Sequence, residues 1–334
     1  MKAILHIGHP KTGTSHLQNT LALNYSQLLE QGVYYPVDFR AVGNNDYQEL
    51  ARQGRVSSGN GHPFYRSLRK QETRWIDSWL DRLTEIPAEH LVLSSESFFY
   101  SPRITQAMVH MLRSRGHSVL VYASLPSLES GVIAAYAQNV RNHMFHRDIF
   151  SFLEKLQYHG QFRFLTTHRS LIGQVEPDEV VILPYVRDGV FGKGIVDDFF
   201  VACGLPSTTL SEASGLNRSL SAEANAVIQL ANAFGDVNLS NRLVHTMEQA
   251  DGGGTRLFDY LLTAELQSLV WERYGKQVKG VAPILAEKAG DAAVERWMAK
   301  ATPTETLLDE SYLRKLARLA LRPASKTTAP QQSP

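Results

Sequence analysis

The chain has 334 residues, with 34 Lys and Arg against 33 Asp and Glu, so its formal charge is +1 with neutral histidines. Hydrophobic residues make up 43% and charged residues 20%, which is typical of a globular protein with a sizeable core and excludes intrinsic disorder for all but the ends. The near-zero charge argues against a general nucleic-acid binder, because such proteins normally carry a basic excess.

Cysteine content and hydropathy indicate the compartment. Cys203 is the single cysteine, so no intramolecular disulfide and no Cys-based zinc cluster can form, as is common in a reducing compartment. The apolar stretch Met1–Ile7 is too short for a signal peptide, and no run of about 18 apolar residues occurs. We therefore expect a cytoplasmic protein without a membrane span.

Four short apolar runs predict buried strands, because they are rich in Val, Ile and Leu and lack polar alternation. They are Ala3–Ile7, Leu91–Ser95, Ser118–Tyr122 and Glu179–Leu183. Helical spacing appears between them, at about 14–30, 73–86, 102–115, 128–142 and 163–175. Strands that alternate with helices imply crossover connections. The sequence therefore predicts an α/β fold with a central, mostly parallel sheet.

Beyond Pro184 the pattern becomes helical. Helices are predicted at 190–203, 221–234, 238–249, 257–274 and 304–321, with no convincing strand. Ser221 is a suitable N-cap, and Glu223 supplies an acidic first turn. Residues 323–334 have little to bury and are expected to be disordered. We predict one domain over 1–322, with a helical C-terminal half from about 190.

The most informative segment follows the first predicted strand and reads Gly8-His9-Pro10-Lys11-Thr12-Gly13-Thr14-Ser15-His16. A strand, a Gly/Pro turn and a helix start direct backbone N–H groups and a helix N-terminus at one spot, which suits a phosphate-like anion. Lys11 adds a positive charge, and the hydroxyls of Thr12, Thr14 and Ser15 add donors. Gly13 lets the backbone approach a ligand closely.

This loop departs from the nucleotide-triphosphate pattern Gly-x-x-x-x-Gly-Lys-Ser/Thr. Its lysine precedes Gly13 by two residues, and Thr14 stands where that lysine would be. No predicted strand ends in an aspartate that could hold magnesium. ATP or GTP hydrolysis is therefore disfavoured, although a P-loop kinase with a shifted lysine remains an alternative.

The run Pro10-Lys11-Thr12-Gly13-Thr14-Ser15 resembles the phosphosulfate-binding loop of the sulfotransferases, Pro-Lys-Ser/Thr-Gly-Thr-Ser/Thr. Three other segments are similar to the bacterial branch of that family: Leu93-Ser94-Ser95-Glu96, Tyr136-Ala137-Gln138 and Asn217-Arg218-Ser219-Leu220-Ser221. The resemblance covers roughly residues 1–235. It implies a P-loop-like, three-layer fold and 3′-phosphoadenosine 5′-phosphosulfate (PAPS) as the sulfuryl donor.

The same resemblance implies roles for individual residues. Lys11 would neutralise charge on the leaving group, while Thr12, Gly13, Thr14 and Ser15 would hold the 5′-phosphosulfate, with no metal needed. Glu96 is the candidate base because it follows the second predicted strand, at the sheet edge where ligands bind. His9 and His16 are rival bases, and His16 stands where some relatives place an aromatic beside the adenine.

One feature departs from the family pattern. Its members usually carry an arginine just after the third strand and a serine some eight residues later, which together hold the 3′-phosphate of the donor. No arginine occurs here between Arg115 and Arg141. Ser130, with Ser124 and Ser127, can still donate hydrogen bonds. Either Arg218 or Arg141 supplies the charge, or the donor site is altered, as in a non-catalytic nucleotide- or glycan-binding protein.

Two polar regions suggest an acceptor. Residues 40–72 are polar and Gly-rich, with interspersed aromatics, and residues 139–147 gather Asn, Arg and His. Long connections of this kind often line acceptor sites in α/β enzymes. Amide and aromatic surfaces suit sugars, so we expect a small-molecule or glycan acceptor. His143 and His146 lack a carboxylate partner at a zinc-motif spacing, and no metal is expected.

Overall fold

The computed structural model describes most of the chain, and its contacts group into two compact units. The described residues are 1–37, 59–156, 162–206, 209–212, 220–235, 237–250 and 254–320. Unit 1 comprises Met1–Val132, Lys155–Asn217 and Ser268–Ala301, and unit 2 comprises Ile133–Glu154, Arg218–Gln267 and Thr302–Pro334. The single domain over 1–322 stays a prediction, and the predicted tail at 323–334 lies outside the described residues.

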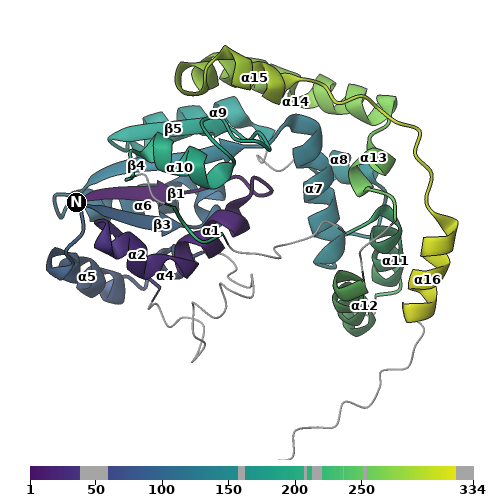
Figure 1. Ribbon diagram of the computed structural model, residues 1–334, viewed down its shortest axis with the longest axis horizontal. Coiled ribbons are helices and arrows are strands. Elements are labelled where there is room, and N and C mark those ends of the chain that lie inside the picture. Colours follow the sequence, from purple (N-terminus) through teal and green to yellow (C-terminus); the bar gives the residue numbers. More distant parts are fainter. Residues whose placement is uncertain are drawn as a thin grey trace, which may run out of the picture. The chain divides into compact units, whose positions relative to one another are not determined.

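A five-stranded sheet forms the centre of unit 1 (Figure 1). Its strands are β1 (Lys2–His6), β2 (Val33–Tyr34), β3 (His90–Ser94), β4 (Ser118–Leu125) and β5 (Glu179–Pro184). They lie in the order β2-β3-β1-β4-β5, and every neighbouring pair is parallel. This arrangement confirms the predicted α/β fold and all four predicted strands. The edge strand β2 has only two residues, too few for a recognisable pattern.

Helices cover both faces of the sheet in unit 1. Their bounds are α1 (Thr14–Leu23), α2 (Tyr25–Glu30), α4 (His62–Lys70), α5 (Arg74–Asp81), α6 (Pro102–Arg113), α7 (Leu128–Arg141, which continues into unit 2), α9 (Phe164–Ser170), α10 (Ile195–Cys203), α14 (Ala264–Ala289, which begins in unit 2) and α15 (Asp291–Met298). Short 3₁₀ turns follow at η1 (Arg82–Glu85) and η2 (Glu96–Tyr100), and a π-helical turn, η4 (Leu171–Val175), extends α9.

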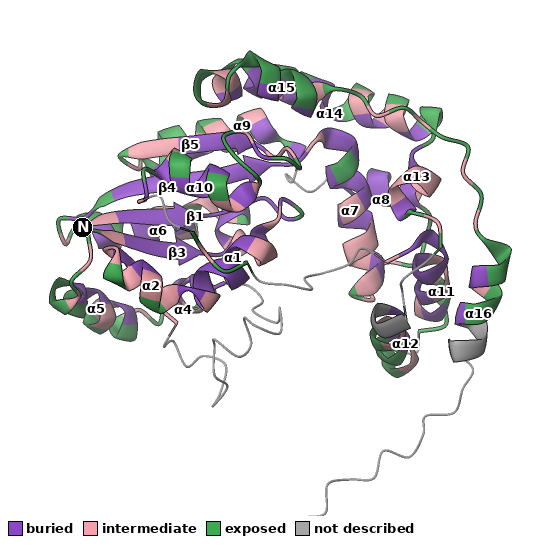
Figure 2. Ribbon diagram, viewed as in Figure 1, coloured by how far each residue is buried: buried purple, intermediate pink, exposed green. Residues whose placement is uncertain are grey.

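Side-chain alternation explains the layers. Ile4, Leu120 and Tyr122 point to one face, where they pack with Leu21 of α1 and Phe199 of α10. Because successive strand residues point to opposite faces, their neighbours in the strands face the other way, toward α6, whose buried residues include Met108 and Leu112. Figure 2 shows the strands buried almost throughout. The sheet is therefore covered on both sides, as its continuous apolar strands predict.

Unit 2 consists of helices. Besides its part of α7, it contains most of α8 (Ile149–Leu156), with α11 (Ala222–Ala233), α12 (Val237–Ala250), α13 (Leu257–Leu261) and α16 (Glu310–Ala320). The Ser221 hydroxyl accepts a hydrogen bond from the backbone N–H of Ala224 at 3.1 Å, which confirms the predicted N-cap. The buried carboxylate of Glu223 accepts backbone N–H groups of Thr255 and Asp309 at 3.0 and 2.7 Å. That carboxylate ties two connecting segments to α11.

The helical C-terminal half is confirmed, but several predicted boundaries are wrong, among them the end predicted at 274, since α14 continues to Ala289. The helix predicted at 190–203 begins at Ile195, after a glycine-containing loop. The segment 257–274 is divided because Thr263 Oγ1 accepts the N–H of Leu266 and so starts a new helix. The helix predicted from 304 begins at Glu310, where Asp309 Oδ1 accepts the N–H of Tyr312. Helices α4, α8 and α15 were not predicted.

Two absences concern the described residues alone. No helix among them is both long and apolar enough to cross a membrane. Past β5, no segment of them forms a strand, apart from a single bridge between Ser221 and Arg256.

Candidate functional site

The carboxyl ends of the parallel strands meet at one edge of the sheet. The register pairs His6 of β1 with Ser94 of β3 and with Tyr122 of β4, so the segments that follow these strands emerge side by side. The chain runs from β1 toward the β2 edge and from β4 toward the β5 edge. Strand order therefore reverses beside β1, and open α/β sheets bind ligands at such a reversal.

The loop after β1 has an unusual backbone. Lys11 has φ 69° and Gly13 has φ 75°, both in the left-handed region. The Thr12 hydroxyl donates to the His9 carbonyl at 2.7 Å, and the Ile7 N–H donates to the Tyr122 carbonyl at 2.9 Å. A non-glycine residue keeps a positive φ only where its surroundings impose it, and such residues cluster at ligand-binding sites. Lys11 is exposed at this turn.

His9 supports this loop from beneath. The residue is fully buried, and its ring lies 5.0 Å from Phe99, 5.4 Å from Phe162 and 5.6 Å from Phe164, between ring centroids. Its Nδ1 is 2.8 Å from the Pro10 carbonyl, which can only accept, so Nδ1 carries a proton. An imidazole enclosed in this way positions the loop, and its burial argues against its role as a rival base.

Glu96 lies next to the loop. It is the first residue of η2, two residues after the end of β3, and it is half-buried. Burial raises the pKa of the Glu96 carboxyl, while the Thr14 hydroxyl and the positive charge of Lys11 lower it. These effects require proximity, so the fold brings Lys11, Thr14 and Glu96 together from two distant segments. A carboxylate with a raised pKa beside an ammonium group is suited to accept a proton.

Two buried polar atoms meet beside Gly8. A Cβ placed on Gly8 would lie 2.7 Å from His6 Nε2 and 2.8 Å from Thr14 Oγ1. Neither atom has a hydrogen bond of good geometry with a described residue, although the Thr14 hydroxyl is near enough to Glu96 to lower the pKa of its carboxyl. Buried polar atoms are normally satisfied. Thr14 therefore keeps unused hydrogen-bonding capacity at the start of α1, as a residue that binds an anion requires.

The orientation of His6 follows from its neighbours. Ser94 Oγ lies 2.7 Å from His6 Nδ1 and accepts from Gln18 Nε2 at 2.9 Å. Because the Gln18 amide only donates here, the Ser94 proton is directed to Nδ1, and His6 Nε2 carries the ring proton. Burial lowers the pKa of His6 to about 3. The imidazole is therefore neutral at physiological pH, and its N–H faces the space beside Gly8.

A hollow of about 450 Å³ adjoins the loop. Its wall includes His16 of α1 and, after β5, Tyr185, Arg187, Phe191 and Lys193. It reaches the Lys11 loop, because a Cβ on Gly13 would lie 3.3 Å from Tyr185 Cε2. Arg187 and Lys193 are exposed, and neither side chain pairs with a carboxylate among the described residues. Aromatic rings and two cations suit a nucleotide base and its phosphate.

The first turn of α10 holds this second loop in place. Asp198 Oδ1 accepts the N–H groups of Val190 and Phe191 at 2.7 and 2.8 Å, and Asp197 Oδ2 accepts that of Lys193 at 2.7 Å. Burial raises the pKa of Asp198, and the two backbone donors lower it. This loop was not predicted, because the sequence pattern favoured a helix from residue 190. The glycines in Val190-Phe191-Gly192-Lys193-Gly194 were the available signal.

The other residues predicted to bind the donor lie in different parts of the chain and differ in exposure. Ser15 and His16 lie in the first turn of α1, half-buried. Ser130 is exposed in the first turn of α7, whereas Ser124 is buried, with its hydroxyl 3.0 Å from that of Tyr122. Arg218 lies outside the described residues. Arg141 ends α7, in unit 2.

The two predicted acceptor regions also differ. Residues 40–58 lie outside the described residues, and 62–70 form α4 rather than a loop. In unit 2, the ring nitrogens of His143 lie 2.9 and 2.8 Å from the side-chain oxygens of Asn232 and Asn241. This histidine is engaged within its unit. No group of three potential metal-ligating side chains occurs in the described parts of the chain.

Comparison with known proteins gives one structural match. No protein-family model matches the sequence, and no curated protein matches it either. Among solved structures, the chain is similar to a sulfotransferase from Alicyclobacillus acidocaldarius, with a TM-score of 0.39 and 15% sequence identity. The match covers 73% of this chain and 96% of the other.

Proposed function

We propose that this protein is a sulfotransferase that moves a sulfuryl group from PAPS to a hydroxyl or amine of a small-molecule or glycan acceptor. One observation carries the proposal: Glu96, which follows β3, lies beside Lys11 and Thr14 where strand order reverses, and these two residues belong to a loop whose sequence resembles a phosphosulfate-binding loop. A cation, a hydroxyl donor and a carboxylate are the three groups that the reaction needs.

We assign each part of the donor to a group of residues in unit 1. The loop N–H groups, with Thr12, Thr14 and Ser15, would hold the 5′-phosphosulfate at the N-terminus of α1. The nucleoside would occupy the 450 Å³ hollow, where His16 and Phe191 supply rings. That hollow also contains cations in place of the arginine absent after β4. We assign the 3′-phosphate to Arg187 and Lys193.

The residues would divide the chemistry between them. Bound PAPS supplies a sulfuryl group that passes in line to the acceptor, as the bond from sulfur to the 5′-phosphate oxygen breaks and adenosine 3′,5′-bisphosphate leaves. Lys11 would neutralise the charge that grows on that oxygen. Glu96 would accept the proton released from the acceptor. Positioning and charge stabilisation then provide most of the rate.

The deciding experiment is calorimetric titration with adenosine 3′,5′-bisphosphate and, separately, with ATP and Mg²⁺. We expect micromolar binding of the bisphosphate that is lost in Lys11→Ala and kept in Lys279→Ala, an exposed lysine of α14. Transfer of labelled sulfate from PAPS to a panel of glycans and small alcohols should then depend on Glu96. Preference for ATP and Mg²⁺ would indicate a kinase, and absence of bisphosphate binding would indicate a non-catalytic protein.

A further inference from the structure

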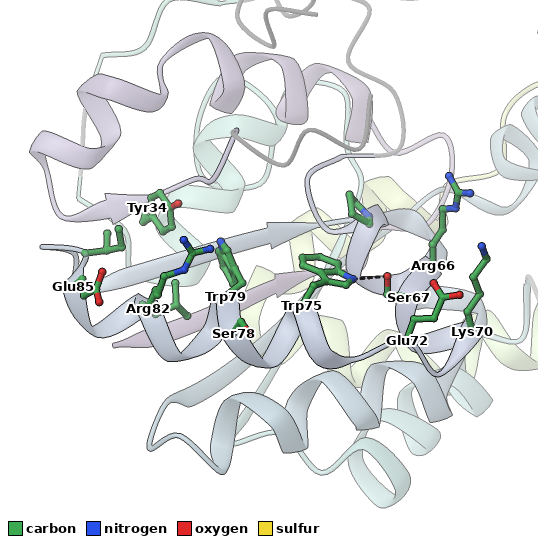
Figure 3. A pocket seen from close by; sticks show the side chains of 13 residues that line it. Tyr34, Arg66, Ser67, Lys70, Glu72, Trp75, Ser78, Trp79, Arg82 and Glu85 are labelled. Carbon is green, nitrogen blue, oxygen red and sulfur yellow. Dashed lines mark hydrogen bonds between the residues drawn. The ribbon is translucent and has the colours of Figure 1, made fainter. Parts of the chain in front are cut away.

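A second, larger hollow of about 930 Å³ lies on unit 1, away from the cations of the first one. It is bounded by Tyr34 of β2, by α4, by α5 and by η1. Figure 3 shows the lining side chains in a row, from Tyr34 and Arg82 through the two indoles of Trp79 and Trp75 to Arg66 and Lys70. We call the hollow lined by these side chains the α4–α5 groove. Its size is that of a small-molecule binding site.

The centre of the groove is a fixed aromatic platform. Trp75 and Trp79 are four residues apart on α5, about 6 Å along the helix axis. Both indoles lie 4.9 Å from the ring of the buried Phe64, between centroids. Tyr34 stacks on Trp79 at 6.4 Å, and Trp75 Nε1 donates to Ser67 Oγ at 2.7 Å. The platform is therefore held before any ligand arrives, although Trp75 remains 37% exposed.

Charges of both signs surround the platform. The cations are Arg66, Lys70 and Arg82, all exposed, and none of them forms an ion pair with a described carboxylate. Two exposed carboxylates, Glu72 and Glu85, also belong to the lining. Each end of the row thus presents a cation together with a carboxylate (Figure 3).

We infer that the α4–α5 groove binds an acidic oligosaccharide. Flat indoles pack against the apolar faces of sugar rings, unpaired Arg and Lys bind carboxylate or sulfate groups, and Glu72 and Glu85 accept hydrogen bonds from sugar hydroxyls. A single-stranded nucleic acid also needs aromatic and basic residues, but its continuous phosphate backbone would be repelled by both carboxylates. An acidic oligosaccharide carries hydroxyls beside each acidic group, and these can donate hydrogen bonds to Glu72 and Glu85, which a phosphate backbone cannot do.

The groove begins close to the candidate base. His62, the first residue of α4, has its Nδ1 3.1 Å from the hydroxyl of Ser97, which directly follows Glu96. Arg66 is one turn further along α4, about 6 Å along its axis. If the proposed function holds, on which this step rests, the groove binds the acceptor and directs it to Glu96. The substrate would then be an acidic glycan.

Direct binding tests the groove separately from catalysis. The full chain is titrated with an oligogalacturonate, with a neutral cello-oligosaccharide of equal length and with an oligothymidylate. We expect the oligogalacturonate to bind most tightly and Trp75→Ala to weaken it about tenfold. Arg82→Gln should weaken it about fivefold at low salt. The matched controls Phe234→Ala and Arg169→Gln, both at exposed positions, should leave it unchanged.

Several outcomes would overturn the inference. Tighter binding of the oligothymidylate would assign the groove to nucleic acid, and equal binding of the neutral sugar would refute the requirement for acidity. Binding that survives both groove variants would lie elsewhere, and so would contradict the location. Because Arg82 is exposed, its variant keeps the test valid if Trp75→Ala fails to fold. Oligogalacturonate binding without bisphosphate binding would refute the proposed function but leave the groove standing, and the reverse result would refute only the groove.

Discussion

Replacing Arg187 with glutamine is expected to weaken binding of adenosine 3′,5′-bisphosphate without affecting adenosine 5′-monophosphate. The two ligands differ by the 3′-phosphate alone, which we assign to Arg187 and Lys193. Glutamine keeps most of the length of the side chain and its ability to donate, but removes the charge. The comparison therefore isolates the ion pair from any loss of packing around the nucleoside.

The magnitude follows from the exposure of the guanidinium. A hydrogen bond to a charged group contributes about 1.5–3 kcal/mol, and the lower end applies here because Arg187 is exposed to solvent. A loss of about 1.5 kcal/mol corresponds to about tenfold in Kd. Lys193 is equally exposed, so Lys193→Gln should cost a similar factor. If the two cations act independently, the double variant should lose about a hundredfold.

The measurement is calorimetric titration of both ligands into the wild type, each single variant and the double variant. Arg169→Gln, which changes an exposed arginine of α9, controls for net charge. The losses should shrink as salt is raised, because exposed charges are screened. An equal loss of affinity for both ligands would show that Arg187 binds the 5′-phosphate or stabilises the loop. Unchanged affinity for both ligands would show that Arg187 does not belong to the nucleotide site.

Three further changes test the interior of the site. Burial raises the pKa of Glu96, while the Thr14 hydroxyl lowers it. Thr14→Val should therefore move the acid limb of the kcat/KM profile to higher pH. An unmoved limb would show that Thr14 does not influence the ionisation of Glu96. Burial lowers the pKa of His6 from 6.5 to about 3. Between these values the unfolded chain binds more protons, so stability should fall by up to about 5 kcal/mol as pH drops through that window; urea titrations of His6→Gln should show a shallower fall. Gly8→Ala brings a methyl group within 2.8 Å of two buried polar atoms and should destabilise by about 1–3 kcal/mol, whereas Gly173→Ala, with no atom within 4 Å of its Cβ, should not show this loss.

Local amino-acid composition was sufficient to predict most of the strands of the fold. Strands covered on both faces must be apolar throughout, so β1, β3, β4 and β5 are visible as continuous runs of Val, Ile and Leu. The two-residue β2 has no such signal. Helix boundaries were less predictable, because the division at Thr263 depends on a single hydroxyl that caps a new helix.

The anion loop could be recognised from its sequence because its glycines, lysine and hydroxyls are contiguous, and so a short pattern contains the whole feature. The partnership of Lys11 with Glu96 was only an expectation, since it requires β1 and β3 to be neighbours. The role of Arg187 and Lys193 could not be predicted from the sequence. Their use depends on where the loop after β5 lies, and two carboxylates of α10 fix that position.

The parallel sheet and the anion loop could therefore be predicted from the amino-acid sequence, because neighbouring residues encode burial and backbone conformation. Tertiary structure alone decided which cations face the nucleotide hollow and that Tyr34, Trp79 and Arg66 line one groove. These residues belong to separate elements, and only the packing of helices on the sheet brings such elements together.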